Sequence, residues 1–151
     1  MHRYNACVNQ QYTIEYLPPL IPGEKRAASA GTYREVEDVM QRIYKENPSY
    51  WPYGLSIPMH TNMYAIRDKG TEKIAGFVGW QEFNEGGKKV GAYSIGILPE
   101  YRKHGFAKEA VAKLLMEKSG HVDRVCAFIM PKNGPSHALA NSLSVPIVEK
   151  F

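Results

Sequence analysis

The sequence predicts an α/β protein with a mixed central sheet and helices on both of its faces. Three observations indicate this fold class. Residues 90–130 have the pattern of a strand, a basic loop with a glycine, an amphipathic helix and a second strand, which makes a crossover with parallel pairing. Residues 63–98 contain three apolar runs at hairpin spacing. Residues 32–46 carry apolar side chains at helical intervals.

The N-terminal third is expected to contain one strand and one helix. Tyr12–Leu17 alternates weakly between polar and apolar residues, and two prolines follow it, as at the end of a strand. Residues 1–11 have no pattern and are expected to be irregular. Thr32 and Glu35 fit a capping box, so a helix is expected to begin there and to end at Asn47 and the proline after it.

The middle of the chain is expected to form three strands. Aromatic residues and prolines are spread between residues 50 and 63 too irregularly for a long element. The strands are then expected over residues 63–67, 73–83 and 90–98, and residues 68–70 and 84–87 supply turn residues between them.

Two helices and two strands are expected in the C-terminal part. A helix is expected from Ala107 to Gly120, because apolar residues recur there three and four positions apart. Asp123–Met130 is expected to be a buried strand. Residues 133–135, Asn-Gly-Pro, open a last short helix, with proline at a permitted first position. Val145–Phe151 has the character of a final strand.

Length and composition favour one folded domain over residues 1–151. The chain has 151 residues, of which 44% are hydrophobic and 23% charged, with no repeat or low-complexity tract. The formal net charge of +4 implies a mild attraction to anions. Lysine and arginine are dispersed rather than clustered, which disfavours a nucleic-acid-binding domain.

The cysteines and the apolar segments restrict the compartment and the chemistry. Cys7 and Cys126 are far apart and form no metal-binding or redox motif, so no metal site is expected. Cys126 lies in an apolar run and is expected in the core. No apolar segment follows the first residues, and none reaches the length of a membrane span. The expected location is the cytoplasm, with no membrane partner.

Residues 95–107, Ile-Gly-Ile-Leu-Pro-Glu-Tyr-Arg-Lys-His-Gly-Phe-Ala, are the most informative stretch. An apolar strand ends at the proline, and a helix begins at the alanine. The N–H groups at the start of a helix lack intrahelical partners and form an anion site. Arg102, Lys103 and His104 lie in the same loop, so the expected anion is a phosphate group.

This stretch resembles the GNAT superfamily of acetyl-CoA-dependent N-acetyltransferases. The superfamily signature is an apolar strand, Pro-Glu-Tyr-Arg, and then Arg/Gln-x-x-Gly-x-Gly/Ala at the head of a helix, which Arg102, Gly105 and Ala107 fill here. A second landmark is an asparagine after the next strand with a small residue three positions on, and Asn133 and Ser136 match it. The resemblance covers about residues 32–145.

The resemblance implies a GNAT fold that binds acetyl-CoA between the strands at 90–98 and 123–130. The pyrophosphate is expected on backbone N–H groups from Lys103 to Lys108, and the pantetheine arm beside Ile95–Ile97, where Gly96 suits a bulge or a close approach. Asn133 is expected to bind the pantetheine, to cap its helix, or both. The expected cofactor-binding residues are Ile95, Gly96, Ile97, Arg102, Lys103, His104, Gly105, Phe106, Ala107, Lys108, Asn133 and Ser136.

The sequence departs from the superfamily at the positions of the general acid and base. A tyrosine that many relatives carry seven residues after the asparagine is Ala140 here. Glutamates that serve as base in other members correspond to Phe128 and Gly91. Tyr93 and Glu82 are the candidate catalytic replacements. His60, in the aromatic segment, is a further candidate, and a water chain is another way to move the protons.

The expected reaction is direct transfer of an acetyl group from acetyl-CoA to a primary amine of a small molecule or a protein. The segment between the first helix and the early strands walls the acceptor pocket in this superfamily, so some residues between Tyr44 and Tyr64 are expected to line it. Two alternatives stay open: a degenerate, non-catalytic acyl-CoA-binding module, and a domain of a larger, phage-encoded protein.

The C-terminal segment also departs from the superfamily. Leu143, Ser144 and Val145 replace Leu-Gly-Phe, and the strand that relatives usually add is missing after Phe151. A sheet that ends here would expose unpaired backbone groups, and such an edge tends to recruit another chain. A homodimer, or a domain of a longer protein, is therefore expected, with residues 145–151 at or near the contact.

Overall fold

The computed structural model contains a mixed sheet whose strands follow one another in chain order. The structure describes residues 5–9, 11–18, 27–102 and 105–149, and within them the sheet has seven strands. Each pair from β1 to β5 is antiparallel, whereas β6 pairs in parallel with both β5 and β7. The strands are β1 (Asn5–Asn9), β2 (Tyr12–Leu17), β3 (Asn62–Asp68), β4 (Ile74–Glu85), β5 (Lys88–Ile97), β6 (Arg124–Phe128) and β7 (Ile147–Val148).

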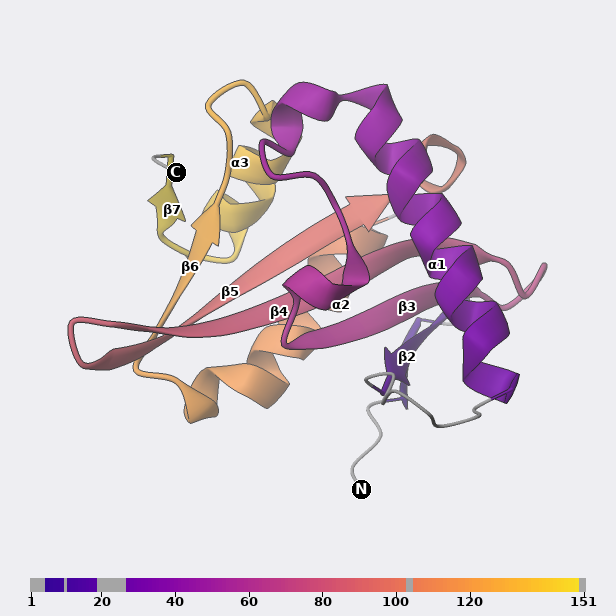
Figure 1. The fold of residues 1–151 in the computed structure, drawn as a ribbon, viewed down its shortest axis with the longest axis horizontal. Coiled ribbons are helices and arrows are strands. Elements are labelled where there is room, and N and C mark those ends of the chain that lie inside the picture. Colours follow the sequence, from indigo (N-terminus) through magenta and orange to yellow (C-terminus); the bar gives the residue numbers. More distant parts are fainter. Residues whose placement is uncertain (1–4, 10, 19–26, 103–104, 150–151) are drawn as a thin grey trace.

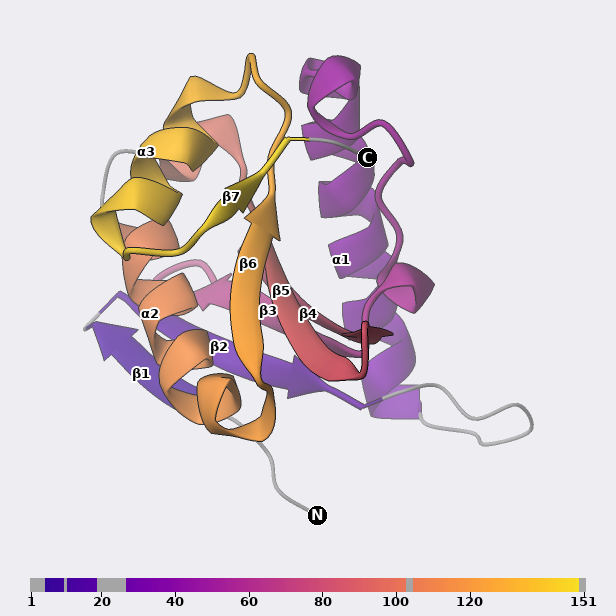
Figure 2. The same cartoon turned by 90° about the vertical axis from the view of Figure 1, so that its left-hand side faces the viewer.

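Helices cover both faces of this sheet, as predicted. Figures 1 and 2 show α1 on one face, and α2 and α3 on the other. Short 3₁₀ helices, named η1 to η4, lie in the connections. The helices are α1 (Ala27–Glu46), η1 (Pro48–Tyr50), η2 (Ile57–Met59), η3 (Pro99–Tyr101), α2 (Phe106–Lys118), η4 (Ser119–His121) and α3 (Gly134–Ser142).

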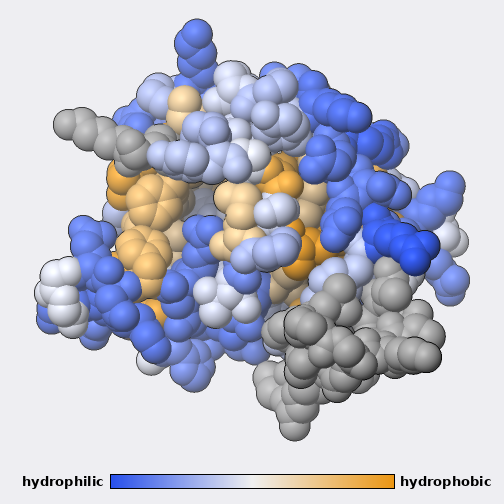
Figure 3. All heavy atoms as spheres, in the orientation of Figure 1, coloured by the Kyte–Doolittle hydropathy of each residue, from blue (hydrophilic) through white to orange (hydrophobic). Residues whose placement is uncertain are grey.

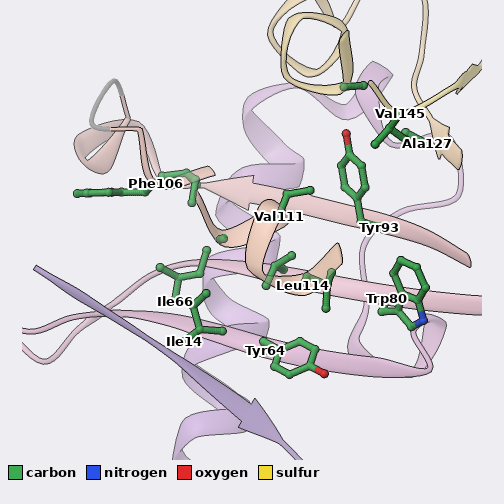
Figure 4. Close-up of a cluster of buried hydrophobic side chains, with 14 of the residues drawn as sticks. Ile14, Tyr64, Ile66, Trp80, Tyr93, Phe106, Val111, Leu114, Ala127 and Val145 are labelled. Atoms are coloured by element: carbon green, nitrogen blue, oxygen red, sulfur yellow. The ribbon is translucent and has the colours of Figure 1, made fainter. Parts of the chain in front are cut away.

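Each face of the sheet has its own hydrophobic core. Successive side chains of a strand point to opposite faces, so Met63 of β3 packs under α1 and Tyr64 packs under α2. On the α2 side, Trp80 and Leu114 belong to the same buried cluster as Tyr64, which Figure 4 shows between the strands and the helix. Because β4 is covered on both sides, its residues from Ile74 to Trp80 are all buried.

The parallel strands β5 and β6 separate soon after they begin to pair. Their register joins Val90 to Arg124 and ends where Ala92 meets Cys126, whereas β5 continues to Ile97. The last residues of β5 therefore have a strand partner on the β4 side only. The predicted split of the sheet lies between these two strands.

The structure corrects the expectations for the N-terminal region. Asn5–Asn9 forms β1, an antiparallel partner of β2, so the expectation of irregular structure over residues 1–11 is wrong there. Pairing through backbone groups needs no apolar alternation, which is why the sequence pattern did not reveal this strand. The helix α1 begins at Ala27, and Thr32 lies inside it rather than at its cap. Ala27, Ala28 and Ala30 favour helix and extend it backwards.

The last strand is shorter than predicted. The strand β7 covers only Ile147–Val148 of the expected Val145–Phe151, and residues 150 and 151 lie outside the described part of the chain. Pro146 lacks an N–H group and enters the pairing only through its carbonyl, which accepts from Ala127 N–H at 2.9 Å. The strand expected to be buried over Asp123–Met130 forms as β6, but only Cys126 and Ala127 of it are buried. The other predicted helices and strands are confirmed, with their ends shifted by a few residues.

Candidate functional site

A cavity of about 560 Å³ opens where β5 and β6 separate. Its walls come from the end of α1, η1, the end of β5, η3, and the first residues of α2 and α3. All of the predicted cofactor-binding residues that the structure describes line it, and Lys103 and His104 lie outside the described residues. The lining residues in this set are Ile95, Gly96, Ile97, Arg102, Gly105, Phe106, Ala107, Lys108, Asn133 and Ser136.

The N-terminus of α2 forms one wall of the cavity. Gly105 is the N-cap residue with φ of +77°, a conformation that favours glycine, and no side chain of the described residues caps this end. The first intrahelical acceptor here is the Gly105 carbonyl, which takes the N–H of Glu109 at 3.2 Å. The N–H groups at the start of a helix precede any intrahelical bond and carry the positive end of its dipole. This wall therefore attracts an anion.

The open edge of β5 forms a second wall. Leu98 N–H donates to Ala75 O of β4 at 2.9 Å, whereas Lys89 O faces the other way and accepts from Asp123 N–H at 2.8 Å. Backbone groups of successive residues alternate between the two sides of an antiparallel strand. Ile95 and Ile97 have the same parity as Lys89, so their N–H and C=O groups point away from β4 and toward the gap.

Gly96 has a packing role on the α1 face. A Cβ atom there would lie 2.6 Å from Cε1 of Phe77 and 3.0 Å from Cδ1 of Ile43. The pairing of β4 with β5 continues without interruption past Gly96, so the expected bulge is absent at this residue. The glycine lets the Phe77 ring and α1 approach the strand that borders the cavity.

The N-terminus of α3 also faces the cavity. Asn133 is the N-cap residue, and its Oδ1 accepts from Ser136 N–H at 3.3 Å. It is 7% exposed, which leaves its amide group at the cavity wall with little access to bulk water. The predicted capping role of Asn133 is confirmed. Two helix N-termini thus converge on one cavity, and both add positive potential to it.

Arg102 links two elements of the cavity wall through hydrogen bonds. Its Nε donates to Ile97 O at 2.9 Å, and a terminal nitrogen donates to the Glu46 carboxylate at 2.6 Å. This ion pair joins the end of α1 to the loop before α2. The guanidinium predicted to sit near phosphate is therefore engaged with Glu46, whereas Lys108 is exposed at the start of α2.

Tyr93 lies on β5 at the opening but outside the cavity lining. Figure 4 shows its ring rising from β5, with the hydroxyl directed toward α3 on the side of Ala127 and Val145. The hydroxyl oxygen is buried and makes no hydrogen bond to any residue that the structure describes. Burial raises the pKa of Tyr93 to about 12, so the phenol keeps its proton at neutral pH. Ala140 of α3 is fully buried in the same cluster.

Glu82 lies away from the cavity, near the hairpin of β4 and β5. Its carboxylate accepts from Trp80 Nε1 at 2.7 Å and lies 3.6 Å from Nζ of Lys89. The residue paired with it is Gly91, where a Cβ atom would lie 2.1 Å from the Trp80 ring. The indole therefore occupies the place of any side chain at Gly91.

The α1 end of the cavity was only partly predicted. Tyr50 and Trp51 belong to the aromatic segment and line the cavity, whereas Tyr53 is 69% exposed. Ile43 and Glu46 also line it, and no motif marked them. The usable signal was the predicted end of the helix at Asn47, which places the last turn of α1 beside the aromatic segment.

Two classes of site have no support within the described residues. No group of three or more histidine, cysteine, aspartate or glutamate side chains there could hold a metal ion. No helix in the same part of the chain is long and apolar enough to cross a membrane.

Comparison with known proteins gives a consistent result. The family model for the acetyltransferase (GNAT) domain matches residues 8–144. A comparison with curated protein sequences gave no match.

Solved structures of acetyltransferases share the fold. A GNAT-family acetyltransferase from Bacillus anthracis has a TM-score of 0.61 and 16% identity, with 89% of this chain and 79% of that chain covered. RimL, a ribosomal L7/L12 alpha-N-protein acetyltransferase, has a TM-score of 0.67 and 12% identity, with 94% and 80% covered. The Salmonella typhimurium enzyme that modifies the N-terminal serine of L7/L12 has a TM-score of 0.65 and 11% identity, with 89% and 80% covered.

Proposed function

The chain belongs to the acetyltransferase (GNAT) domain family, and from this premise we propose that it transfers an acetyl group from acetyl-CoA to a primary amine. The observation that carries the proposal is the cavity at the separation of β5 and β6, onto which two helix N-termini converge. The cavity combines an anion site with an unpaired strand edge, and a nucleotide-linked thioester needs both.

The described lining residues suit the parts of coenzyme A. Backbone N–H groups between Gly105 and Lys108 would hold the pyrophosphate, helped by the α2 dipole. Ile95 and Ile97 would hydrogen-bond the pantetheine amides as a neighbouring strand would. The side-chain amide of Asn133 would hydrogen-bond the pantetheine arm as well. The bound cofactor supplies an activated acetyl thioester, and the protein aligns it with an amine.

Tyr93 is the proposed proton donor to the departing sulfur. Its phenol is neutral at neutral pH and has no hydrogen-bond partner among the described residues, so its proton is available. It points toward α3, where Ala140 has no polar group to offer. Glu82 is already bound to Trp80 and Lys89, so the proposal assigns it no step.

The acceptor in this proposal is a primary amine of a small molecule or a protein. Structural neighbours include an enzyme that modifies the N-terminal serine of a ribosomal protein, which makes a peptide amino terminus a reasonable first probe. The cytoplasm, with its acetyl-CoA, is the proposed location. A homodimer through the β7 edge is proposed as well, because β7 has no strand on its outer side among the described residues. Light scattering over a wide concentration range tests the dimer.

A non-catalytic acyl-CoA-binding module is the second candidate. The observation in its favour is that Ala140, Phe128 and Gly91 stand where relatives carry an acid or a base. Such a module would bind acetyl-CoA and leave every amine unmodified.

The experiment that separates the two candidates measures release of free coenzyme A from acetyl-CoA. The amine panel contains spermidine, lysine, and peptides that begin with serine or alanine. Release that depends on an amine, with an acetylated product found by mass spectrometry, supports the transferase. Binding of acetyl-CoA by calorimetry without release for any amine would favour the module.

A further inference from the structure

His60 packs on β4, one strand away from the opening between β5 and β6. It follows η2, and its imidazole rests against Gly79 of β4 on the α1 face. A Cβ atom on Gly79 would lie 2.4 Å from Cδ2 and 2.8 Å from Nε2 of His60, so only glycine leaves room for the ring. The Phe77 ring contacts it edge-on, at 6.3 Å between ring centroids.

The register of the sheet places this imidazole beside the separation of the strands. Gly79 pairs with Ser94 of β5, two residues beyond Ala92, the last β5 residue that pairs with β6. Ser94 and Tyr93 are neighbours on β5, so their side chains lie on opposite faces. His60, above β4, and Tyr93, on β5, therefore lie on opposite faces of the sheet and on neighbouring strands.

One ring nitrogen of His60 is hydrogen-bonded, and the other has no hydrogen-bond partner among the described residues. Nδ1 lies 3.0 Å from Ser56 O, and a carbonyl oxygen can only accept, so Nδ1 carries the hydrogen. Nε2 then has a lone pair, and no residue that the structure describes hydrogen-bonds to it. This tautomer is the one that a general base needs.

Burial favours the neutral form of the imidazole. Burial lowers the pKa of His60, and the carbonyls of Ser56 and Ile57 oppose this only in part. No ionised side chain of the described residues contributes. Residues 56–59 carry no charged side chain, β5 presents Ser94 on this face, and Glu82 of β4 is engaged with Trp80 and Lys89.

An acceptor can approach His60 from the part of this face that α1 leaves uncovered. Figure 1 shows that α1 does not cover β6 or much of β5, where the connection that carries η2 crosses in front of the sheet, and Figure 3 shows apolar surface on this face. Phe83 and Phe128 pack together there, with ring centroids 5.8 Å apart and Phe128 38% exposed. The side chain of His60 is itself partly exposed.

Building on the proposed function, we propose that Nε2 of His60 accepts the proton of the acceptor ammonium group. The neutral amine then attacks the acetyl carbonyl carbon, and a C–N bond forms as the C–S bond breaks. Two protons leave the nitrogen in all. The first passes through His60 to solvent. Tyr93 donates its phenol proton to the coenzyme A sulfur, and the second proton from the nitrogen replaces the proton that Tyr93 gave. No oxidant or further reactant is needed.

The test compares pH profiles of kcat/KM for the wild type, His60→Gln and His60→Asn, with acetyl-CoA and a peptide that begins with serine. Asparagine keeps a donor where Nδ1 meets Ser56 O, and both variants lack the base. His121→Gln is the control, because His121 is exposed in η4 at the far end of α2. Melting temperature and acetyl-CoA affinity are measured for every variant.

At pH 6.5 we expect both His60 variants to lose about 100-fold in kcat/KM, the lower range for a general base. The loss shrinks as the pH passes the α-amine pKa of about 8, because free amine no longer needs the base. His121→Gln stays at the wild-type value. The assignment of His60 would be overturned, and the proposed function kept, if the wild type turned over and both His60 variants had pH profiles of kcat/KM that matched or ran parallel to the wild-type profile. If no amine of the panel reacts with the wild type, the proposed function fails, and this step with it.

Discussion

At the scale of single residues, three glycines of the central strands make room for aromatic rings on the faces of the sheet. Gly79 seats the His60 imidazole, Gly91 makes room for the Trp80 ring, and Gly96 makes room for Phe77. In each case an added Cβ atom would lie within 3 Å of a ring atom. The sequence predicted a bulge or a close approach at Gly96 but not the Phe77 ring, because that ring comes from another strand.

His60 gives a prediction about stability and pH. Its pKa is lowered in the folded protein, so the unfolded chain binds more protons once the pH falls below the ordinary histidine value of about 6.5. Folding stability should therefore decrease as the pH drops from about 6.5 toward the lowered pKa.

Urea unfolding at several pH values measures this effect. We expect the slope between pH 6.5 and 5 to be smaller in His60→Gln than in the wild type. Asp68 and Glu100 also have lowered pKa values, but their ordinary values lie near 4, so their effect belongs to a more acidic range. An identical slope in the variant would show that His60 ionises equally in both states.

At the scale of elements, the helix N-termini determine what the cavity can bind. Gly105 has φ of +77°, and an added Cβ atom there meets no protein atom within 4 Å, so the space beside it is open. Gly86, in the hairpin between β4 and β5, has φ of +55° and equally open surroundings, but it lies outside the cavity. Substitution of Gly86 therefore serves as the control for the same substitution of Gly105.

Gly105→Val should weaken coenzyme A binding at least tenfold, because its side chain would occupy the space proposed for phosphate. Gly86→Val carries similar backbone strain and should bind coenzyme A with wild-type affinity. Both variants should lose about 1–2 kcal/mol of stability. Calorimetry gives the affinities. Equal affinities for the two variants would contradict the phosphate site at α2.

Helix α3 gives a prediction about the missing tyrosine. Ala140 is fully buried, so Ala140→Tyr should overpack the core and cost about 1–3 kcal/mol, rather than restore an acid. Ala138 lies on the exposed side of the same helix, and Ala138→Tyr should change stability by less than about 0.5 kcal/mol. Thermal melts of both variants check this. A stable Ala140→Tyr with faster turnover would show that the position can still host the acid.

The sequence predicted the elements that have strong local signals. The loop before α2 was recognisable from Gly105 and its basic neighbours, and Asn133 from its cap position. β1 was not predictable, because its register depends on backbone pairing with β2. The bond between Arg102 and Glu46, and the contact of His60 with Gly79, join residues far apart in sequence. No local pattern encodes such contacts.

At the scale of the whole molecule, the sheet separates two chemical environments. The α2 side holds the proposed anion site and Tyr93, whereas the α1 side holds His60 and the apolar surface of Figure 3. The opening between β5 and β6 connects the two sides. A reaction that removes a proton from one reactant and supplies one to the other suits such a division.

A crystal structure of the protein with acetyl-CoA tests the central claim most directly. We expect the pyrophosphate on the N–H groups of residues 105–108, the pantetheine beside Ile95 and Ile97, and the acetyl group between Tyr93 and His60. Acetyl-CoA bound outside the gap between β5 and β6, or no binding at millimolar concentration, would contradict it.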